Sequence, residues 1–250
     1  MNRILAMVLC SALLAGGCMD MQKNVHVKKD GSATIEETVL LSAQAMAMMA
    51  QQGQDPLAIV EAKYQEAAKK MGEGVTYVKA EKVSDPNTTQ QGLKVTYAVE
   101  DINKLKLLSS PTAINAPSNE EEKALTFEYN KDTGTLTLTP PPADFTDKKK
   151  QEEFEQNLPQ MQMMAQMMQG LRMRIGLTVE GAITETNATY PNEDKTGLTL
   201  IDAKLGEMFA DIEKMKAMYK VSNEEEAKKL IKDWPALKME LEKKVTVKFK

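Results

Sequence analysis

The residues best suited to ligand chemistry in this 250-residue chain are methionines, of which five lie between positions 161 and 168. On a helix at 100° per residue they share one face with Leu171, within about 160° of arc. Thioether sulfur is a soft ligand that selects Cu(I), and methionine also fills irregular apolar gaps and adapts to varied partners. No histidine lies nearby, which favours packing over copper. The candidate ligand face is Met161, Met164, Met167, Met168 and Leu171.

The sequence gives less support for a catalytic site than for this methionine face. His26 is the only histidine, so zinc sites of the usual composition are excluded, and no Gly-x-Ser-x-Gly motif accompanies it. We expect it to be an exposed strand residue. Carboxylate pairs such as Glu36 and Glu37 leave an envelope hydrolase with Asp or Glu acid-base residues as an alternative. We assign no catalytic residue, metal or cofactor, and we expect the protein not to be an enzyme.

Cys18 is the second candidate for chemistry, through the residues that precede it. Arg3 and the apolar residues 4–14 form a secretory signal, which is too short to span a bilayer. The sequence Leu14-Ala15-Gly16-Gly17-Cys18 resembles the lipobox of bacterial lipoproteins, in which the cysteine becomes the lipidated first residue. Ordinary signal cleavage after the same small residues is the alternative.

The lipobox resemblance implies a location and a membrane partner. Residues 1–17 would be the signal peptide, and acyl chains on Cys18 would hold the protein to a membrane of the cell envelope, facing the periplasm. Met19 rather than Asp follows the cysteine, which favours the outer over the inner membrane if the organism is Gram-negative.

Composition limits the remaining functions. Removal of residues 1–17 takes away one charged side chain, Arg3, so the 32 basic residues become 31 against 36 acidic residues, a net charge of −5. This mild, mixed charge argues against a nucleic-acid partner, for which a basic face would be expected. Cys10 lies in the signal and Cys18 carries the lipid, so no disulfide forms and the core alone must hold the domain.

The pattern of elements predicts one periplasmic α+β domain over residues 18–250. Alternating residues flank turns at Asp30-Gly31 and at 131–134, and a final strand is expected at 244–250. Helical spacing covers 42–71, 203–215 and 222–231, with Asp55 and Asp202 as expected N-caps and a capping box from Ser222 to Glu225. We therefore expect a largely antiparallel sheet built from hairpins, with several packed amphipathic helices. Residues 140–171 could form a flap or a helical insertion.

The first hairpin also carries a family resemblance. Cys18 followed by the hairpin sequence from Val25 to Thr34 is similar to LppM-type lipoproteins, and the strand at 172–186 followed by Thr196-Gly197-Leu198-Thr199 resembles their later part. The resemblance implies an exported α+β domain that binds glycolipid, and it stops before the helices from 203 onward.

Together these observations predict a membrane-anchored lipoprotein that acts as a non-enzymatic binding module in the cell envelope. The expected ligand is a lipid or an envelope protein. The alternatives are the envelope hydrolase and a methionine-rich Cu(I)-binding protein.

Overall fold

The computed structural model describes residues 19–53, 55–108, 124–141 and 170–250. The candidate residues Met161, Met164, Met167 and Met168 lie outside these ranges, as does most of the predicted flap at 140–171. Every described strand and helix follows Cys18, so the sheets and the core between them use no residue of the predicted signal.

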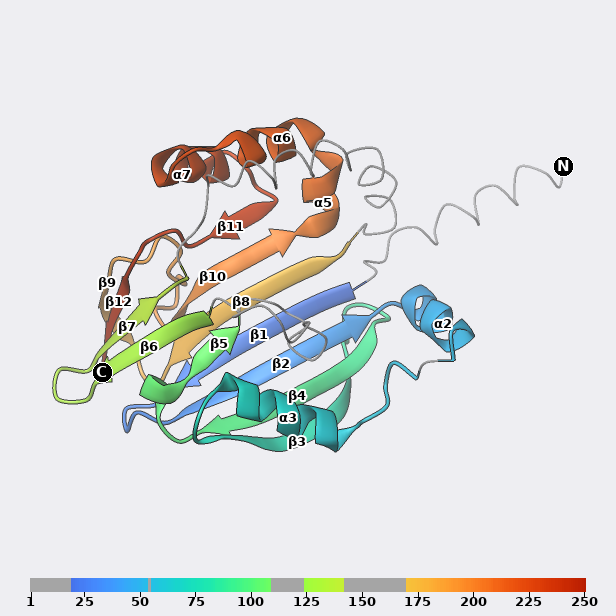
Figure 1. Cartoon of the computed structure of the whole chain (residues 1–250), viewed down its shortest axis with the longest axis horizontal. Helices are drawn as coiled ribbons and strands as arrows, with labels where there is room; N and C mark the ends of the chain where they lie inside the picture. The colour runs from blue at the N-terminus through green and yellow to red at the C-terminus, as the bar shows by residue number, and fades with distance from the viewer. Residues whose placement is uncertain (1–18, 54, 109–123, 142–169) are drawn as a thin grey trace, which may run out of the picture.

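Seven strands form a large twisted sheet in the order β11-β10-β8-β1-β2-β4-β3 (Figure 1). All its ladders are antiparallel except the β1–β8 pair, which is parallel. In chain order the strands are β1 (Met19–Val27), β2 (Ala33–Leu41), β3 (Val75–Ser84), β4 (Gln91–Val99), β8 (Arg172–Val179), β10 (Gly197–Lys204) and β11 (Leu237–Met239).

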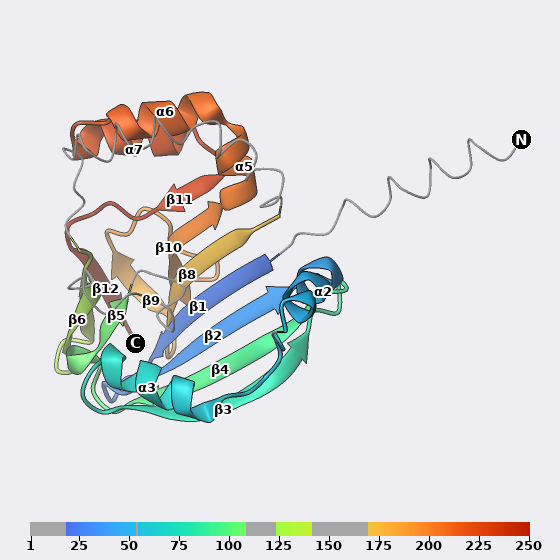
Figure 2. The same ribbon diagram turned by 45° about the vertical axis from the view of Figure 1, so that its right-hand side comes forward.

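Five further strands form a second sheet in the order β5-β6-β7-β12-β9. They are β5 (Lys106–Leu108), β6 (Ala124–Asn130), β7 (Thr135–Thr139), β9 (Ile183–Thr186) and β12 (Val245–Phe249). This sheet stands against one end of the large sheet, close to the β1–β2 turn (Figure 2). The turn itself contains Gly31 at φ 89°, a conformation that glycine adopts without steric cost.

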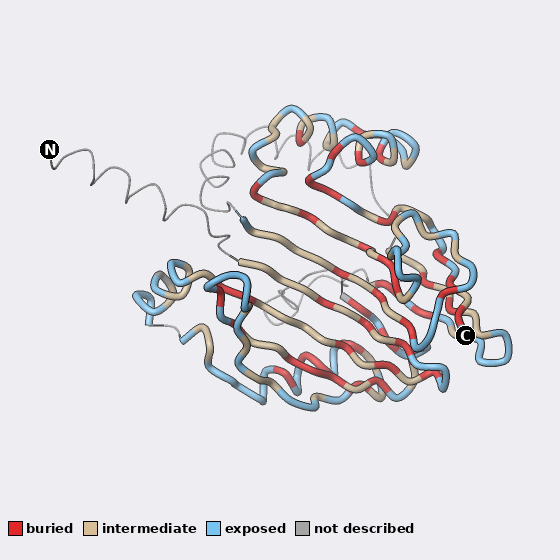
Figure 3. The backbone as a smooth tube through the Cα atoms, turned by 180° about the vertical axis from the view of Figure 1, so that it is seen from behind, coloured by how far each residue is buried: buried red, intermediate tan, exposed pale blue. Residues whose placement is uncertain are grey.

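The described helices are short and lie at the margins of the large sheet. They are α2 (Ala43–Gln51), α3 (Glu61–Met71), the 3₁₀ turn η1 (Ile102–Lys104), α5 (Leu205–Ala210), α6 (Ile212–Lys220) and α7 (Glu224–Lys232). Helix α3 packs on β3, and α5 to α7 gather beside β10 and β11 over a satellite core that includes Trp234. From behind, no described helix lies in front of the strands of the large sheet (Figure 3).

The main core lies between the large sheet, α3 and the second sheet. Because side chains alternate across a strand, Val25, Ile35, Leu177 and Tyr97 project from one face of four adjacent strands, and each is 0% exposed. Phe127 of the second sheet belongs to the same cluster of buried side chains. The two sheets therefore share one apolar interior.

The predicted fold class is wrong. Of the described residues 43% are in strands and 25% in helices, so the protein is mostly β, with two sheets and few short helices. Asp202, the expected helix cap, lies inside β10 and pairs with Arg172. Asp55 accepts a hydrogen bond from the backbone N–H of Leu57, and α3 begins only at Glu61. The local hydrogen bond of Asp55 competes with helix formation, whereas Asp202 is held in a strand by its distant partner Arg172.

Candidate functional site

One face of the large sheet changes character along its strands. Deep in the core it carries buried aliphatic side chains, but toward the start of β1 it also carries half-buried ones, such as Met19, Met21 and Val39. A hollow of about 280 Å³ lies there. Its apolar lining comes from β1, β2, β4, β8, α3, α2 and the segment after α2, and consists of Met19, Met21, Val39, Leu41, Leu93, Val95, Met173, Ile175, Tyr64, Met49 and Pro56.

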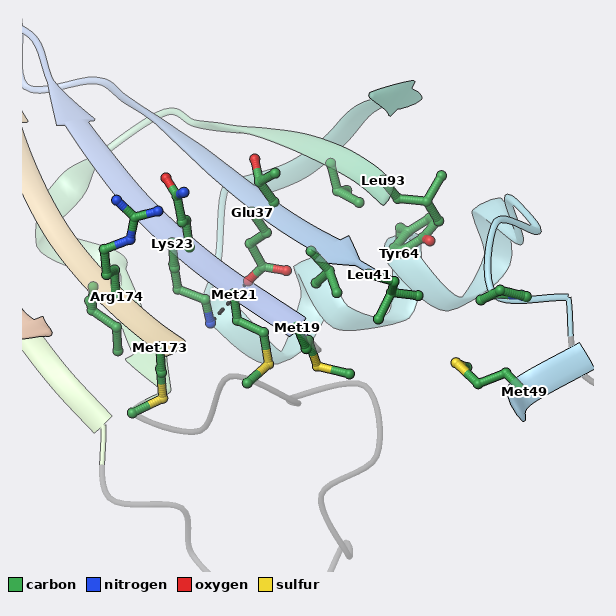
Figure 4. A pocket seen from close by; sticks show the side chains of 16 residues that line it. Met19, Met21, Lys23, Glu37, Leu41, Met49, Tyr64, Leu93, Met173 and Arg174 are labelled. Carbon is green, nitrogen blue, oxygen red and sulfur yellow. Dashed lines mark ion pairs between the residues drawn. The ribbon is translucent and has the colours of Figure 1, made fainter. Parts of the chain in front are cut away.

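Strand register gathers these residues. Met21 lies opposite Val39 in β2 and beside Met173 in β8, and Val39 in turn lies opposite Leu93 in β4. The four side chains therefore form one row across the sheet. Met19, Met21 and Met173 point to the same side of the sheet, whereas Arg174 points to the other (Figure 4). Met49 reaches the hollow from α2, across from the strands.

An ion pair closes the inner end of the hollow. Lys23 and Glu37 lie directly opposite each other in β1 and β2, with their Nζ and Oε1 atoms 2.9 Å apart (Figure 4). The Lys23 side chain is 5% exposed and that of Glu37 is 16% exposed. Removing either partner would leave the other charge unpaired at a place that water reaches poorly. The resulting loss of folding free energy is far larger than the contribution of a surface ion pair.

Three tyrosines from α3, β3 and β4 form a cluster, and one of them, Tyr64, also lines the hollow. Tyr64 of α3 stacks on Tyr77 of β3 with ring centroids 5.8 Å apart, and Tyr77 meets Tyr97 edge-on at 6.4 Å. Among the described residues, the buried Tyr97 hydroxyl has no hydrogen-bond partner. Burial, and then the negative charge of Glu37, raise the pKa of Tyr97 far above its usual range, so the hydroxyl stays neutral.

The opposite face of the same strands is polar. Arg172 donates two hydrogen bonds to Asp202, at 2.8 and 2.7 Å, and Arg174 donates one to Asp20. The hydrogen bonds from Arg172 hold the pKa of Asp202 below its ordinary value of 3.8. His26 lies on this face, half-buried rather than exposed as expected, with its Nδ1 3.1 Å from the Thr178 hydroxyl.

Of the predicted ligand face only Leu171 is described. It is half-buried, and its carbonyl accepts a hydrogen bond from the Leu205 N–H at the start of α5. Sequence reasoning missed the methionines that line the hollow. Alternation of Met19 and Met21 ahead of Val25 was a usable signal, because all three share one face of β1. Met173 and Met49 gave no such signal, since only the fold brings their strand and helix to β1.

The described residues lack two features that are common in metal sites and acid-base sites. They contain no group of three or more His, Cys, Asp or Glu side chains that could hold a metal ion. Where a described carboxyl group has a shifted pKa, the shift is downward, and hydrogen bonds to the carboxylate cause it in every case. A general acid requires the opposite shift, because it must hold its proton near neutral pH.

Within the described ranges no helix has the length and apolarity that crossing a bilayer requires. No protein-family model and no curated protein sequence matches the chain. Among solved structures, the chain is similar to the folded domain of the LppM protein of Mycobacterium tuberculosis, determined by NMR. The two share 10% identity over 74% of this chain and 81% of that domain, with a TM-score of 0.33. LppM-type lipoproteins are the family that the first hairpin resembles, but a likeness this distant carries no argument about function.

Proposed function

We propose that this protein is a membrane-anchored, non-enzymatic lipid-binding module of the bacterial cell envelope, and that the hollow holds an acyl chain. The observation that carries the proposal is an apolar hollow, open to solvent, beside the closed main core. Met19, Met21, Met49 and Met173 supply its adaptable walls. Unbranched thioether side chains re-pack around ligands of varied shape, as acyl chains require.

The size of the hollow favours one chain over a whole lipid. Its volume of 280 Å³ matches about nine water volumes and lies just below the usual range of ligand pockets, which begins at about 300 Å³. The Lys23–Glu37 pair blocks the way to Val25 and Ile35, because a chain that passed it would have to displace a buried ion pair. A headgroup and any second chain therefore stay outside the hollow.

Native mass spectrometry of residues 19–250, exported to a bacterial periplasm without the anchor, tests the proposal. This portion contains every described element of both sheets and their shared core. We expect a fraction of the protein to carry the extra mass of a phospholipid or glycolipid. A bare monomer mass would contradict the proposal and make the hollow ordinary packing space.

A matched pair of variants ties the lipid to the hollow. Val39→Trp fills the hollow from β2 and is expected to abolish the lipid mass. Thr34→Trp places the same side chain on the other face of the same strand and should leave the lipid mass unchanged. Thermal unfolding followed by circular dichroism checks that both variants fold. Lipid retained by a folded Val39→Trp variant would count against the site.

Cu(I) binding is the second candidate, because Met19, Met21 and Met173 bring three thioethers to one side of the sheet. The two functions separate in one titration. Cu(I) added under anaerobic conditions should bind the wild type and fail to bind a Met21→Leu, Met173→Leu variant if copper is the ligand. An acyl chain should bind both, since leucine preserves the apolar lining.

A further inference from the structure

The hollow lies at the end of the sheet from which the predicted anchor emerges. Strand β1 starts at Met19, and Met19 both lines the hollow and directly follows Cys18 in the chain. One residue spans at most about 3.6 Å, so lipid attached to Cys18 has no tether that would let the domain turn away from the bilayer. The anchor therefore determines which end of the sheet faces the membrane.

The chain composition at this end suits a lipid surface. Met19 pairs with Leu41 at the end of β2, and α2 starts two residues later, so α2 lies next to the start of β1 (Figure 1). Residues 43–60 contain one charged side chain, Asp55, although 27% of the whole chain is charged and about five would be expected in eighteen residues. Ile59 and Val60 are 40% and 42% exposed, two of the three large apolar side chains exposed among the described residues.

The far end of the sheet has the opposite character. Lys28, Lys29 and Asp30 form the exposed turn between β1 and β2, and Lys131 is exposed in the turn between β6 and β7. The nine residues of β1 separate this end from the start of the strand by roughly 27 Å, at about 3.3 Å per residue. The weakly charged segment 43–60 and the charged β1–β2 turn thus lie at opposite ends of β1.

From these observations we infer that α2 and residues 55–60 rest in the headgroup layer of the membrane and that the hollow opens directly onto the bilayer. This inference rests on the proposed function and adds the source of the ligand, which is the membrane that holds the anchor. Helices that lie in this layer place their apolar side chains among the upper acyl groups. Because α2 has no basic side chain, its apolar contacts and the anchor on Cys18 are what hold it there. Met49 of α2 and Pro56 then form a wall of the hollow at membrane level.

Depth-dependent fluorescence quenching tests the orientation with the full lipidated protein. The native Trp234 is 2% exposed in the satellite core, so its emission reports folding and should not respond to lipid. Ala47→Trp places a probe on the exposed surface of α2, and Lys131→Trp places a control in the far turn. In vesicles of phosphatidylethanolamine and phosphatidylglycerol with brominated acyl chains, we expect Ala47→Trp to lose emission relative to unbrominated vesicles, and Lys131→Trp to lose none.

The outcomes separate this inference from the proposed function. Equal emission of Ala47→Trp in brominated and unbrominated vesicles would overturn the orientation, even if the unanchored domain carries lipid by mass spectrometry. Loss of emission by Ala47→Trp without any lipid mass would support the orientation and contradict the hollow as a lipid site. A mature protein whose mass lacks acyl chains on Cys18 would overturn both.

Discussion

The two ends of the apolar face of the large sheet use the same strands and the same alternation, yet they differ in what covers them. At the closed end Val25, Ile35 and Leu177 are 0% exposed beneath the main core, whereas at the open end Met21, Val39 and Met173 are half-buried around a hollow. The Lys23–Glu37 pair lies between the two. The sequence pattern alone predicts that both ends are buried in the core. The contrast shows that the elements packed against this face decide which end becomes closed core and which end keeps space for a ligand.

Substitution of the ion pair at the boundary between the two ends should give the largest change in stability. Lys23→Met leaves Glu37 nearly buried without its partner, and we expect a loss of about 3–5 kcal/mol in the free energy of unfolding. Urea denaturation measures it. The double variant Lys23→Met, Glu37→Met should recover most of the loss, because no charge is then left unpaired. If the double variant is as unstable as the single one, the lost stability comes from the ion pair itself and not from an unpaired buried charge.

A pair of truncations compares the ends directly. Leu177→Ala opens a cavity in the closed end and should cost about 2–5 kcal/mol. Met21→Ala at the open end should cost about 1 kcal/mol, because its side chain is only half-buried and water can fill the space. Denaturant midpoints at equal m-values check both. Equal losses would mean that the open end is packed as tightly as the core.

An ion pair on the polar face, at the open end of the sheet, should make a smaller and pH-dependent contribution to stability. The folded pKa of Asp202 lies below 3.8, so the stability from its pairing with Arg172 is fully present above that value and is lost as the pH falls through the lowered pKa. Asp202→Asn should therefore lower the unfolding temperature at neutral pH. The curves of variant and wild type should converge once the pH falls below the lowered pKa of Asp202. Parallel curves at all pH values would contradict this role.

The smallest effect is expected from Tyr97→Phe. Its hydroxyl is buried in the closed end and has no partner in the part of the chain that the structure describes, so removing it takes away a desolvation cost and should raise stability by about 1 kcal/mol or less. Thermal unfolding measures the change. A clear loss of stability would show that the hydroxyl has a partner in solution, such as a bound water.

Local sequence patterns predicted the hairpins but not which other strands pair with them. The Asp30-Gly31 turn and the turn after Asn130 were predicted, and both join paired antiparallel strands. The capping box was predicted one residue early, since Asn223 caps α7 and Glu226 accepts hydrogen bonds from Ser222. The strand expected over 172–186 divides into β8 and β9, which lie in different sheets, because Gly181 at φ 94° turns the chain between them.

The sequence by itself determined the side-chain alternation of β1 and β2, the turn between them and the weak charge of residues 43–60, because each depends on neighbours in the chain. Only the tertiary structure decided that β8 lies parallel to β1, that Met173 therefore lies beside Met21, and that Lys23 meets Glu37 at the inner end of a hollow. Strand pairing across about 150 residues depends on which apolar faces can be covered together. That is a property of the whole core and not of any segment.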